Sequence, residues 1–259
     1  AFLNCKYGKA SLQRVKRRAV NQANINAKEL SNLTIPLPSE TFQKEIQKLI
    51  VEAQKQKVLS EKLYREAEEI LLEELGLLNW KPKTTSFKYY GVKFEVEDTV
   101  SSIKLSEILK TDSRIDSEYW ESHYSEIVKK IKSYNNFDFV KNLCSIHENL
   151  TTPEKSKIHK YIELANIGNN GVIEGYIEDY GKNLPTRARR LIQTNQVIIS
   201  SIEGSLSSCA LIPQELDNSF CSTGFYLISS DRINSETLLV LFKSAPFQAL
   251  MKKACSGTI

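Results

Sequence analysis

Basic side chains gather in two segments of this chain, although its formal net charge is only +4 over 259 residues. Residues 1–38 hold seven lysines or arginines against one acid, Glu29. A second cluster contains no acid and consists of Lys182, Arg187, Arg189 and Arg190, with Thr186 beside them. Clustered basic groups bind polyanions, although either cluster alone also fits a solvated surface. Two clusters in segments rich in Asn, Gln and Ser favour nucleic acid, because these side chains contact base edges and phosphates.

A wider set of candidate DNA contacts lies in polar loops or in the basic lead-in. These candidates are Lys155, Lys157, Lys160, Ser200, Ser201, Ser205, Arg17, Arg18, Asn24 and Asn26. The alternative for each serine is an ordinary turn residue. The lead-in residues have a second alternative, which is contact with a partner protein. Among the basic side chains we expect Arg187 and Arg189 to read guanines and Lys182 to contact a phosphate.

The residue types that would support catalysis are scattered. Three histidines (His123, His147 and His159) are too far apart in the sequence to suggest a metal site, and the five cysteines form no C-x-x-C pair. The chain has neither a Pro-Pro loop, which an adenine methyltransferase would need, nor a glycine-rich phosphate loop. A nuclease could draw only on Glu174, Glu178 and Asp179, and no nucleophile motif supports a Ser–His–Asp site. We therefore predict a non-catalytic protein that needs no cofactor.

A single long helix is predicted from Ser39 to Gly76. Pro38 and Ser39 form a start signal, Gly76 suits a left-handed C-cap, and no Pro or Gly lies between Ser39 and Leu75. Its length would be about 55 Å at about 1.5 Å per residue. Apolar residues at steps of three and four form one stripe: Phe42, Ile46, Leu49, Ile50, Ala53, Leu59, Leu63, Ala67, Ile70 and Leu71. The length favours a spacer that pairs with another helix, and the alternative is an amphipathic helix packed on its own globule.

The chain divides into four predicted parts. They are a basic segment (1–38), the long helix (39–76), a connector (77–100) and a mixed globule (101–259). Within the globule we expect strands at 160–164, 171–177, 196–202, 209–212 and 224–228, and helices at 103–109, 117–134 and 235–253. This pattern predicts an α+β fold with a curved, mainly antiparallel sheet, flanking helices and one long coiled-coil-type helix. No apolar run has membrane-spanning length, and the scattered cysteines favour a reducing cytoplasm.

Several segments resemble the DNA-specificity subunit of type I restriction–modification systems. The segments are 23–26 (AlaAsnIleAsn), 33–38 (LeuThrIleProLeuPro), Gln43, 73–77 (GluGluLeuGlyLeu), 114–120, 196–200 and 221–225. The resemblance implies target-recognition domains that each read half of a split DNA site and are held apart by antiparallel long helices. It also implies docking to DNA methyltransferase (modification) subunits, with the restriction subunit as a further partner. On this reading residues 101–259 are a target-recognition domain, and residues 1–38 are the tail of an upstream one or its repeat equivalent.

The chain departs from that family pattern because it holds one long helix and one full recognition domain. Either the sequence is a fragment, or two copies pair their helices to rebuild a reader with two domains. Because water-exposed apolar area forgoes roughly 25 cal/mol per Å², we predict a homodimer through residues 39–75. The competing function is a helical protein–protein assembly scaffold that does not read DNA. RNA binding is a third class, but the aromatic residues are not grouped as a stacking platform.

Overall fold

The computed structural model describes residues 7, 9–10, 17–18, 23–24, 27–81, 84–89, 92–97, 104–109, 117–134, 136–148 and 150–255. These residues fall into two compact units, 1–58 and 59–259. The first unit contains a short antiparallel pair, β1 (Arg17–Arg18) and β2 (Ala23–Asn24), followed by α2 (Ala27–Ser31). The division between the units falls inside the long helix, whereas the sequence suggested a boundary at its end. The four-part division itself stays a prediction.

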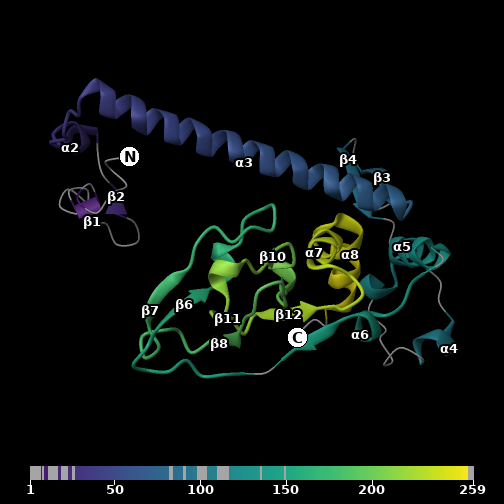
Figure 1. The fold of residues 1–259 in the computed structure, drawn as a ribbon. Helices are drawn as coiled ribbons and strands as arrows, with labels where there is room; N and C mark the ends of the chain where they lie inside the picture. Colours follow the sequence, from purple (N-terminus) through teal and green to yellow (C-terminus); the bar gives the residue numbers. More distant parts are fainter. Residues whose placement is uncertain are drawn as a thin grey trace. The chain divides into compact units, whose positions relative to one another are not determined.

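The long helix is present as α3 (Glu40–Glu74), 35 residues without interruption (Figure 1). At its start, the Ser39 carbonyl accepts from Gln43 N at 3.0 Å and the Ser39 hydroxyl accepts from Phe42 N at 3.4 Å. At its end, Gly76 has a φ of 64°, and its N–H donates to Glu73 O at 3.0 Å while Leu77 N donates to Leu72 O at 2.7 Å. This is a Schellman motif, and only a residue tolerant of positive φ suits the C′ position that Gly76 occupies. Both predicted boundary signals are therefore confirmed.

The apolar stripe predicted for α3 coincides only in part with the face that packs in the second unit. In the second-unit part of the helix, the less exposed positions are Ser60, Tyr64, Glu68 and Leu72, spaced four apart, together with Leu71 of the predicted stripe. By contrast Leu63 is 54% exposed and Ile70 is 69% exposed. The spacing of apolar residues did not predict this packed face correctly, because polar side chains contribute to it as well. The alternative of packing on its own globule therefore holds for this part of the helix, through a face that shares Leu71 with the predicted stripe.

After α3 come a hairpin and short helices. The hairpin joins β3 (Thr84–Tyr89) to β4 (Val92–Glu97) in antiparallel register. The helices that follow are α4 (Leu105–Ile108), η2 (Ser117–Trp120), α5 (Ser122–Ser133) and α6 (Val140–Leu143). Leu72 and Leu77 pack with Ile127 of α5 in one buried cluster, which ties the end of α3 to the second unit.

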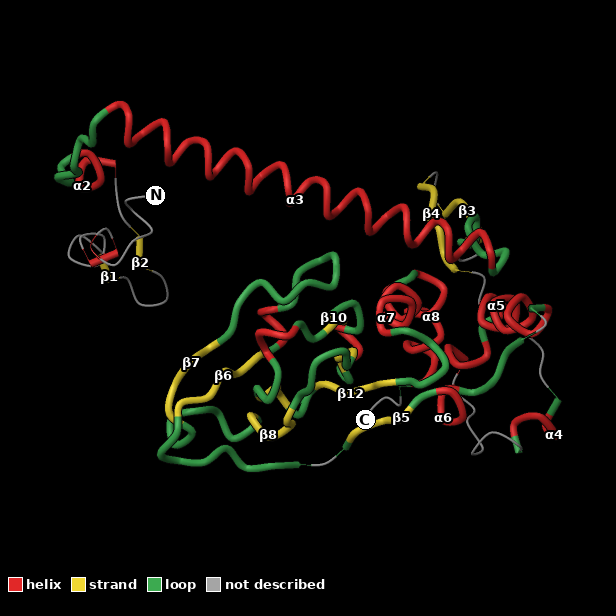
Figure 2. Tube along the Cα trace, viewed as in Figure 1, coloured by secondary structure: helices red, strands yellow, loops and turns green. Residues whose placement is uncertain are grey.

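Two four-stranded sheets form the globule (Figure 2). The first has the order β10-β9-β12-β5 and is wholly antiparallel: β5 (Ser145–His147), β9 (Val197–Ser200), β10 (Cys209–Leu211) and β12 (Phe225–Ser229). The second has the order β7-β6-β11-β8, with β6 and β11 parallel: β6 (Ile158–Ile162), β7 (Ile177–Tyr180), β8 (Ala188–Leu191) and β11 (Phe220–Ser222). Short 3₁₀ turns lie at η3 (Leu164–Asn166), η4 (Glu203–Ser205) and η5 (Gln214–Leu216).

Strand β9 is buried on both faces, so the first sheet is the central layer of the globule. Ile198 joins a core cluster with Ile162 of the second sheet, and Val197 and Ile199 join another cluster with Leu238. The second cluster lies under α7 (Ser235–Lys243), and Met251 of α8 (Ala245–Ala254) packs against it. The predicted α+β class, with mainly antiparallel strands and flanking helices, is confirmed. No helix among the described residues is long and apolar enough to span a membrane.

Several predicted elements were misplaced. The predicted strand 171–177 is wrong up to Tyr176, because positive φ at Gly171 closes a loop that holds only one bridge, Ile167 to Ile173, and β7 begins at Ile177. The predicted helix 235–253 ends at Lys243 and restarts, because Pro246 has no N–H to continue it. The predicted helix 117–134 is likewise divided at Glu121. Strands β5, β8 and β11 were missed, since their short segments lack a clear alternation of apolar and polar residues.

Candidate nucleic-acid interface

The turn after β7 brings Lys182 beside Lys155 and Lys157. Gly181 N donates to Lys157 O at 2.9 Å, and Lys182 N donates to Lys155 O at 3.3 Å. The approach requires glycine at 181, because a Cβ there would collide with the carbonyl of Glu154. Lys155, Lys157 and Lys182 are all exposed. Two basic groups that are separate in the sequence therefore meet on one surface.

Strand β8 carries the arginine pair, where the sequence suggested a loop. Arg189 is exposed, and its Nη2 donates to Thr152 Oγ1 at 3.3 Å. Thr151 N also donates to Arg189 O at 2.7 Å, so the segment that leads to Lys155 runs beside β8. Arg189 thus contacts Thr151 and Thr152, which lie a few residues before Lys155 in the sequence.

Arg190 points the other way along the same strand. It is half-buried, and its Nη1 donates to His147 O at 3.2 Å. Its Nε is buried without a hydrogen-bond partner. Burial raises the pKa of the neighbouring Cys221 thiol to about 12, although the charge of Arg190 opposes that rise. Arg190 therefore anchors β8 to β5 through this hydrogen bond, and its contact with DNA stays a prediction.

Arg187 lies next to β8 and contacts the segment that bonds to the predicted serine Ser201. It is exposed, as is Thr186, and its carbonyl accepts from Thr223 N at 2.9 Å. The next residue, Gly224, accepts through its carbonyl from Ser201 N at 2.9 Å and from Ser201 Oγ at 3.0 Å. Ser201 is exposed and continues the same surface.

Two of the predicted serines and two of the lysines have structural roles. Ser200 is 1% exposed, and its Oγ lies 2.8 Å from Ser205 Oγ, so both stabilise the turn around η4 as the turn alternative proposed. Lys160 Nζ donates to Glu215 O at 2.9 Å, and Lys157 Nζ pairs with Glu154 at 2.6 Å. This pairing lowers the pKa of the exposed Glu154 carboxyl. Lys155 and Lys182 are exposed, and their contacts with DNA stay predictions.

Sequence reasoning missed two tyrosines at this surface. Tyr176 and Tyr180 are each 45% exposed, and lysine ammonium groups lie over both rings. Lys160 Nζ is 4.9 Å from the Tyr176 centroid, and Lys182 Nζ is 5.6 Å from the Tyr180 centroid. The spacing Tyr180-Gly181-Lys182 was the available signal, since an aromatic and a cation two positions apart can share one turn.

The lead-in candidates lie in the first unit. Arg17 and Asn24 are register partners across β1 and β2, and Arg18 pairs with Ala23. Asn26 lies outside the described residues. Among the described residues, no group of three or more His, Cys, Asp or Glu side chains could hold a metal ion.

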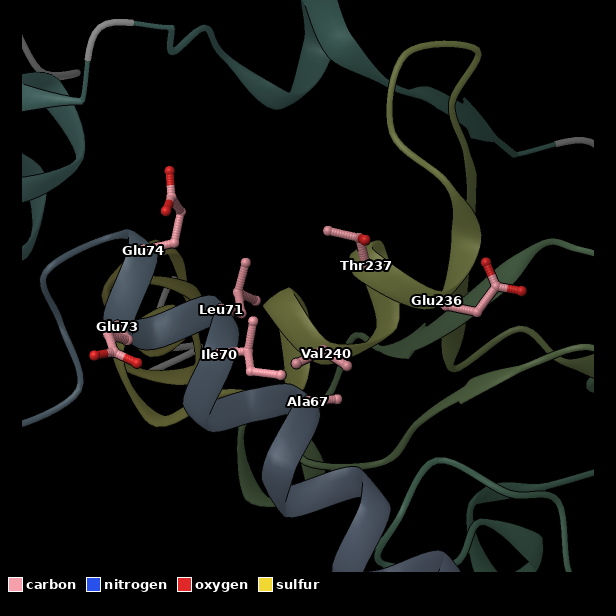
Figure 3. Close-up of a pocket in the computed structure, with 8 residues that line it drawn as sticks. All are labelled: Ala67, Ile70, Leu71, Glu73, Glu74, Glu236, Thr237 and Val240. Atoms are coloured by element: carbon pink, nitrogen blue, oxygen red, sulfur yellow. The ribbon is translucent and has the colours of Figure 1, made fainter.

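A second surface feature is an acidic groove in the second unit, with a volume of about 790 Å³ (Figure 3). Its apolar lining comes from Ala67, Ile70 and Leu71 of α3 and from Val240 of α7, with Thr237 beside them. Three carboxylates line it as well: Glu73, Glu74 and Glu236. Figure 3 shows the Ile70 side chain directed toward Val240, while the Glu73 and Glu236 carboxylates extend away from them. Glu74 also accepts from the Tyr134 hydroxyl at 3.0 Å.

Comparisons with known proteins found similarity only among solved structures. No protein-family profile and no curated protein matches the chain. One similar structure is titled "Crystal structure of HsdS subunit from Thermoanaerobacter tengcongensis", at 28% identity, with a TM-score of 0.36, over 39% of this chain and 29% of that chain. Another comes from a study titled "Structural basis underlying complex assembly and conformational transition of the type I R-M system", at 30% identity, with a TM-score of 0.38, over 40% of this chain and 27% of that one. This chain thus spans less than a third of either. Over that part, it is similar to HsdS specificity subunits of type I restriction–modification systems, the family that its sequence resembles.

Proposed function

We propose that this chain recognises double-stranded DNA sequence-specifically, as all or part of the specificity subunit of a type I restriction–modification complex in the cytoplasm. It would direct methyltransferase and restriction subunits to a split DNA site and would perform no catalysis itself. The observation that carries the proposal is the convergence of exposed Lys155, Lys182, Arg187 and Arg189 from three segments of the chain. The sequence resemblance supports the choice of DNA over other polyanions.

The contacts divide by chemistry. Arg187 and Arg189 present guanidinium groups, which pair in bidentate fashion with guanine O6 and N7 in the major groove. Lys155 and Lys182 supply point charges for phosphates, and exposed Thr186 and Ser201 add hydroxyls. Tyr180 adds an aromatic edge next to Lys182. In the first unit, Arg17, Arg18, Asn24 and Asn26 are proposed to contact DNA or the modification subunit.

The long helix would hold two reading domains apart by pairing with the helix of a second copy. The exposed side chains Leu59, Leu63 and Ile70 support this role. Charge also favours an antiparallel pair. Residues 40–57 contain three acids and four bases, whereas residues 59–74 contain six acids and two bases. Antiparallel pairing would bring the basic part of each helix against the acidic part of the other.

Selection from a random duplex library tests this function. The chain is incubated with its modification subunits at a stated salt concentration, and bound duplexes are separated by electrophoresis and sequenced. We expect one split sequence to be enriched. Equal recovery of all sequences, or no retention of duplex by an assembled complex, contradicts the proposal.

The second candidate function is an assembly scaffold without DNA readout. The acidic groove with its apolar lining favours it, because a basic amphipathic helix of a partner protein suits such a surface. The same selection separates the two functions, since a scaffold assembles with its partners and enriches no sequence.

A further inference from the structure

The segment between β6 and β7 forms a closed loop whose tip reaches α3. At its base, Glu163 and Asn166 cap each other, with Glu163 N donating to Asn166 Oδ1 at 2.9 Å. Gly168 N donates to Val172 O at 2.8 Å, and Glu174 N donates to Asn166 O at 2.8 Å. These bonds make residues 163–174 a compact unit, hereafter the bracket loop.

The tip of the bracket loop is held on three sides. Asn170 Nδ2 donates to Ser60 Oγ of α3 at 2.7 Å, and Leu211 N of β10 donates to Gly171 O at 3.2 Å. A Cβ at Gly171 would lie 2.7 Å from Leu239 Cδ2 of α7, so loop and helix are in close contact there. The two arms of the loop lead into β6 and β7, which carry Lys160 and Tyr180. The bracket loop therefore connects the long helix to the strands that lead to the exposed lysines Lys155 and Lys182.

Within the second unit, α3 packs along a face that runs from Ser60 to Leu72, with Tyr64 and Glu68 half-buried between these ends. Leu72 is buried with Leu77 and Ile127 at one end of the contact face, and Ser60 bonds to Asn170 at the other. Twelve residues separate Ser60 from Leu72, which is about 18 Å along a helix at about 1.5 Å per residue. A hydrogen bond at the far end of this face, about 18 Å from the Leu72 cluster, resists rotation of the globule about the contacts nearer that cluster.

We propose that Asn170 is a positioning residue that sets which half-site spacing the assembled complex accepts. This inference rests on the proposed function and names a residue that controls the geometry of DNA recognition. Adding one base pair between half-sites moves the second by about 3.4 Å and turns it by about 35°, at about 10–10.5 base pairs per turn. A reading surface held at a fixed angle to its spacer helix meets only one such arrangement. Releasing the distal contact broadens the accepted range without altering the side chains that touch bases.

Asn170→Ala and Ser60→Ala each remove the same hydrogen bond from opposite sides. Ser60→Thr keeps the hydroxyl and serves as the conservative rescue. Asn169→Ala is the matched control, because Asn169 is the exposed asparagine next to Asn170. Each variant is assembled with the modification subunits and titrated with the selected duplex. Duplexes with one base pair more or fewer between half-sites, and a duplex with a single half-site, are titrated in parallel.

We expect Asn170→Ala and Ser60→Ala to lower the preference for the selected spacing over its neighbours by about 2- to 10-fold, the range of one hydrogen bond. Single half-site affinity should stay within about twofold, and Ser60→Thr and Asn169→Ala should match the unmodified protein. An unchanged spacing preference overturns the inference. So does a parallel loss of half-site affinity, which would make the contact merely structural. If the unmodified complex selects no split sequence, the proposed function itself fails, which is a distinct result.

Discussion

At the scale of single residues, strand alternation decides which basic groups of β8 reach the surface. Ala188 is buried and Arg190 is half-buried, whereas Arg189 between them is exposed. Successive side chains of a strand point to opposite faces, so two neighbouring arginines acquire opposite roles. From the sequence alone, both arginines were candidates for contact with DNA.

The exposed arginines are predicted to carry specificity. Arg187→Ala or Arg189→Ala should cost about 1–3 kcal/mol of binding and relax the preference at one base pair of the selected site. Arg232→Ala, at an exposed arginine in the turn after β12, should leave both unchanged. Titration against a panel of single-base variants measures this. Uniform weakening on every sequence would show that these arginines contact phosphates instead.

Lys182 is predicted to act through charge alone. Lys182→Ala should weaken binding to all duplexes equally and reduce the slope of log affinity against log salt by about 0.9. Measuring the dissociation constant at several salt concentrations gives the slope. A change confined to particular sequences would contradict the phosphate assignment.

Glycine geometry gives a prediction of stability. Gly171→Ala should lower the free energy of unfolding by about 1–3 kcal/mol, because φ is +77° and the new Cβ would collide with Leu239. Gly204→Ala is the control, because nothing lies within 4 Å of a Cβ there. Chemical denaturation measures both variants. Equal stability of the two would show that the bracket loop adapts.

At the scale of elements, the sequence specifies where α3 begins and ends, but it does not specify which face of the helix packs against the globule. Ser39 and Gly76 start and stop it through local hydrogen bonds, so its bounds could be predicted. The docking face instead depends on what packs against it. Burial raises the pKa of Tyr64 and of Glu68, and lowers that of Lys243 on α7, which shows how polar this contact is.

The exposed stripe of α3 is predicted to mediate self-association. Leu63→Lys should shift the chain at micromolar concentration from dimer to monomer, because it places a charge on an apolar contact. Its thermal stability as a monomer should change little, since Leu63 is 54% exposed. Glu69→Lys adds the same lysine on another face and should leave the dimer intact. Sedimentation analysis reports the masses, and a monomeric unmodified chain would refute the dimer.

At the scale of the whole second unit, two buried thiols lie within the core clusters. Burial raises the pKa of Cys209 to about 11 and that of Cys221 to about 12, and both side chains are 0% exposed. At pH 8 we therefore expect iodoacetamide to label partly exposed Cys255 quickly, while Cys209 and Cys221 react only when the unit unfolds. Mass spectrometry over a denaturant series measures this. Rapid native labelling of Cys221 would show that the contact between the sheets opens locally.

The sequence by itself determined the long helix, the α+β class, the positions of β9, β10 and β12, and the two basic segments. These features depend on local hydrogen bonds, periodicity and charge, all of which are written in consecutive residues. Only the tertiary structure decided that the central strand separates two core clusters and that Arg189 faces outward while Arg190 faces inward. It also decided that Lys155 meets Lys182 and that Asn170 contacts Ser60. Those outcomes depend on which segments pack together, and contacts between segments far apart in the sequence, such as Asn170 and Ser60, leave no periodic signal in either segment.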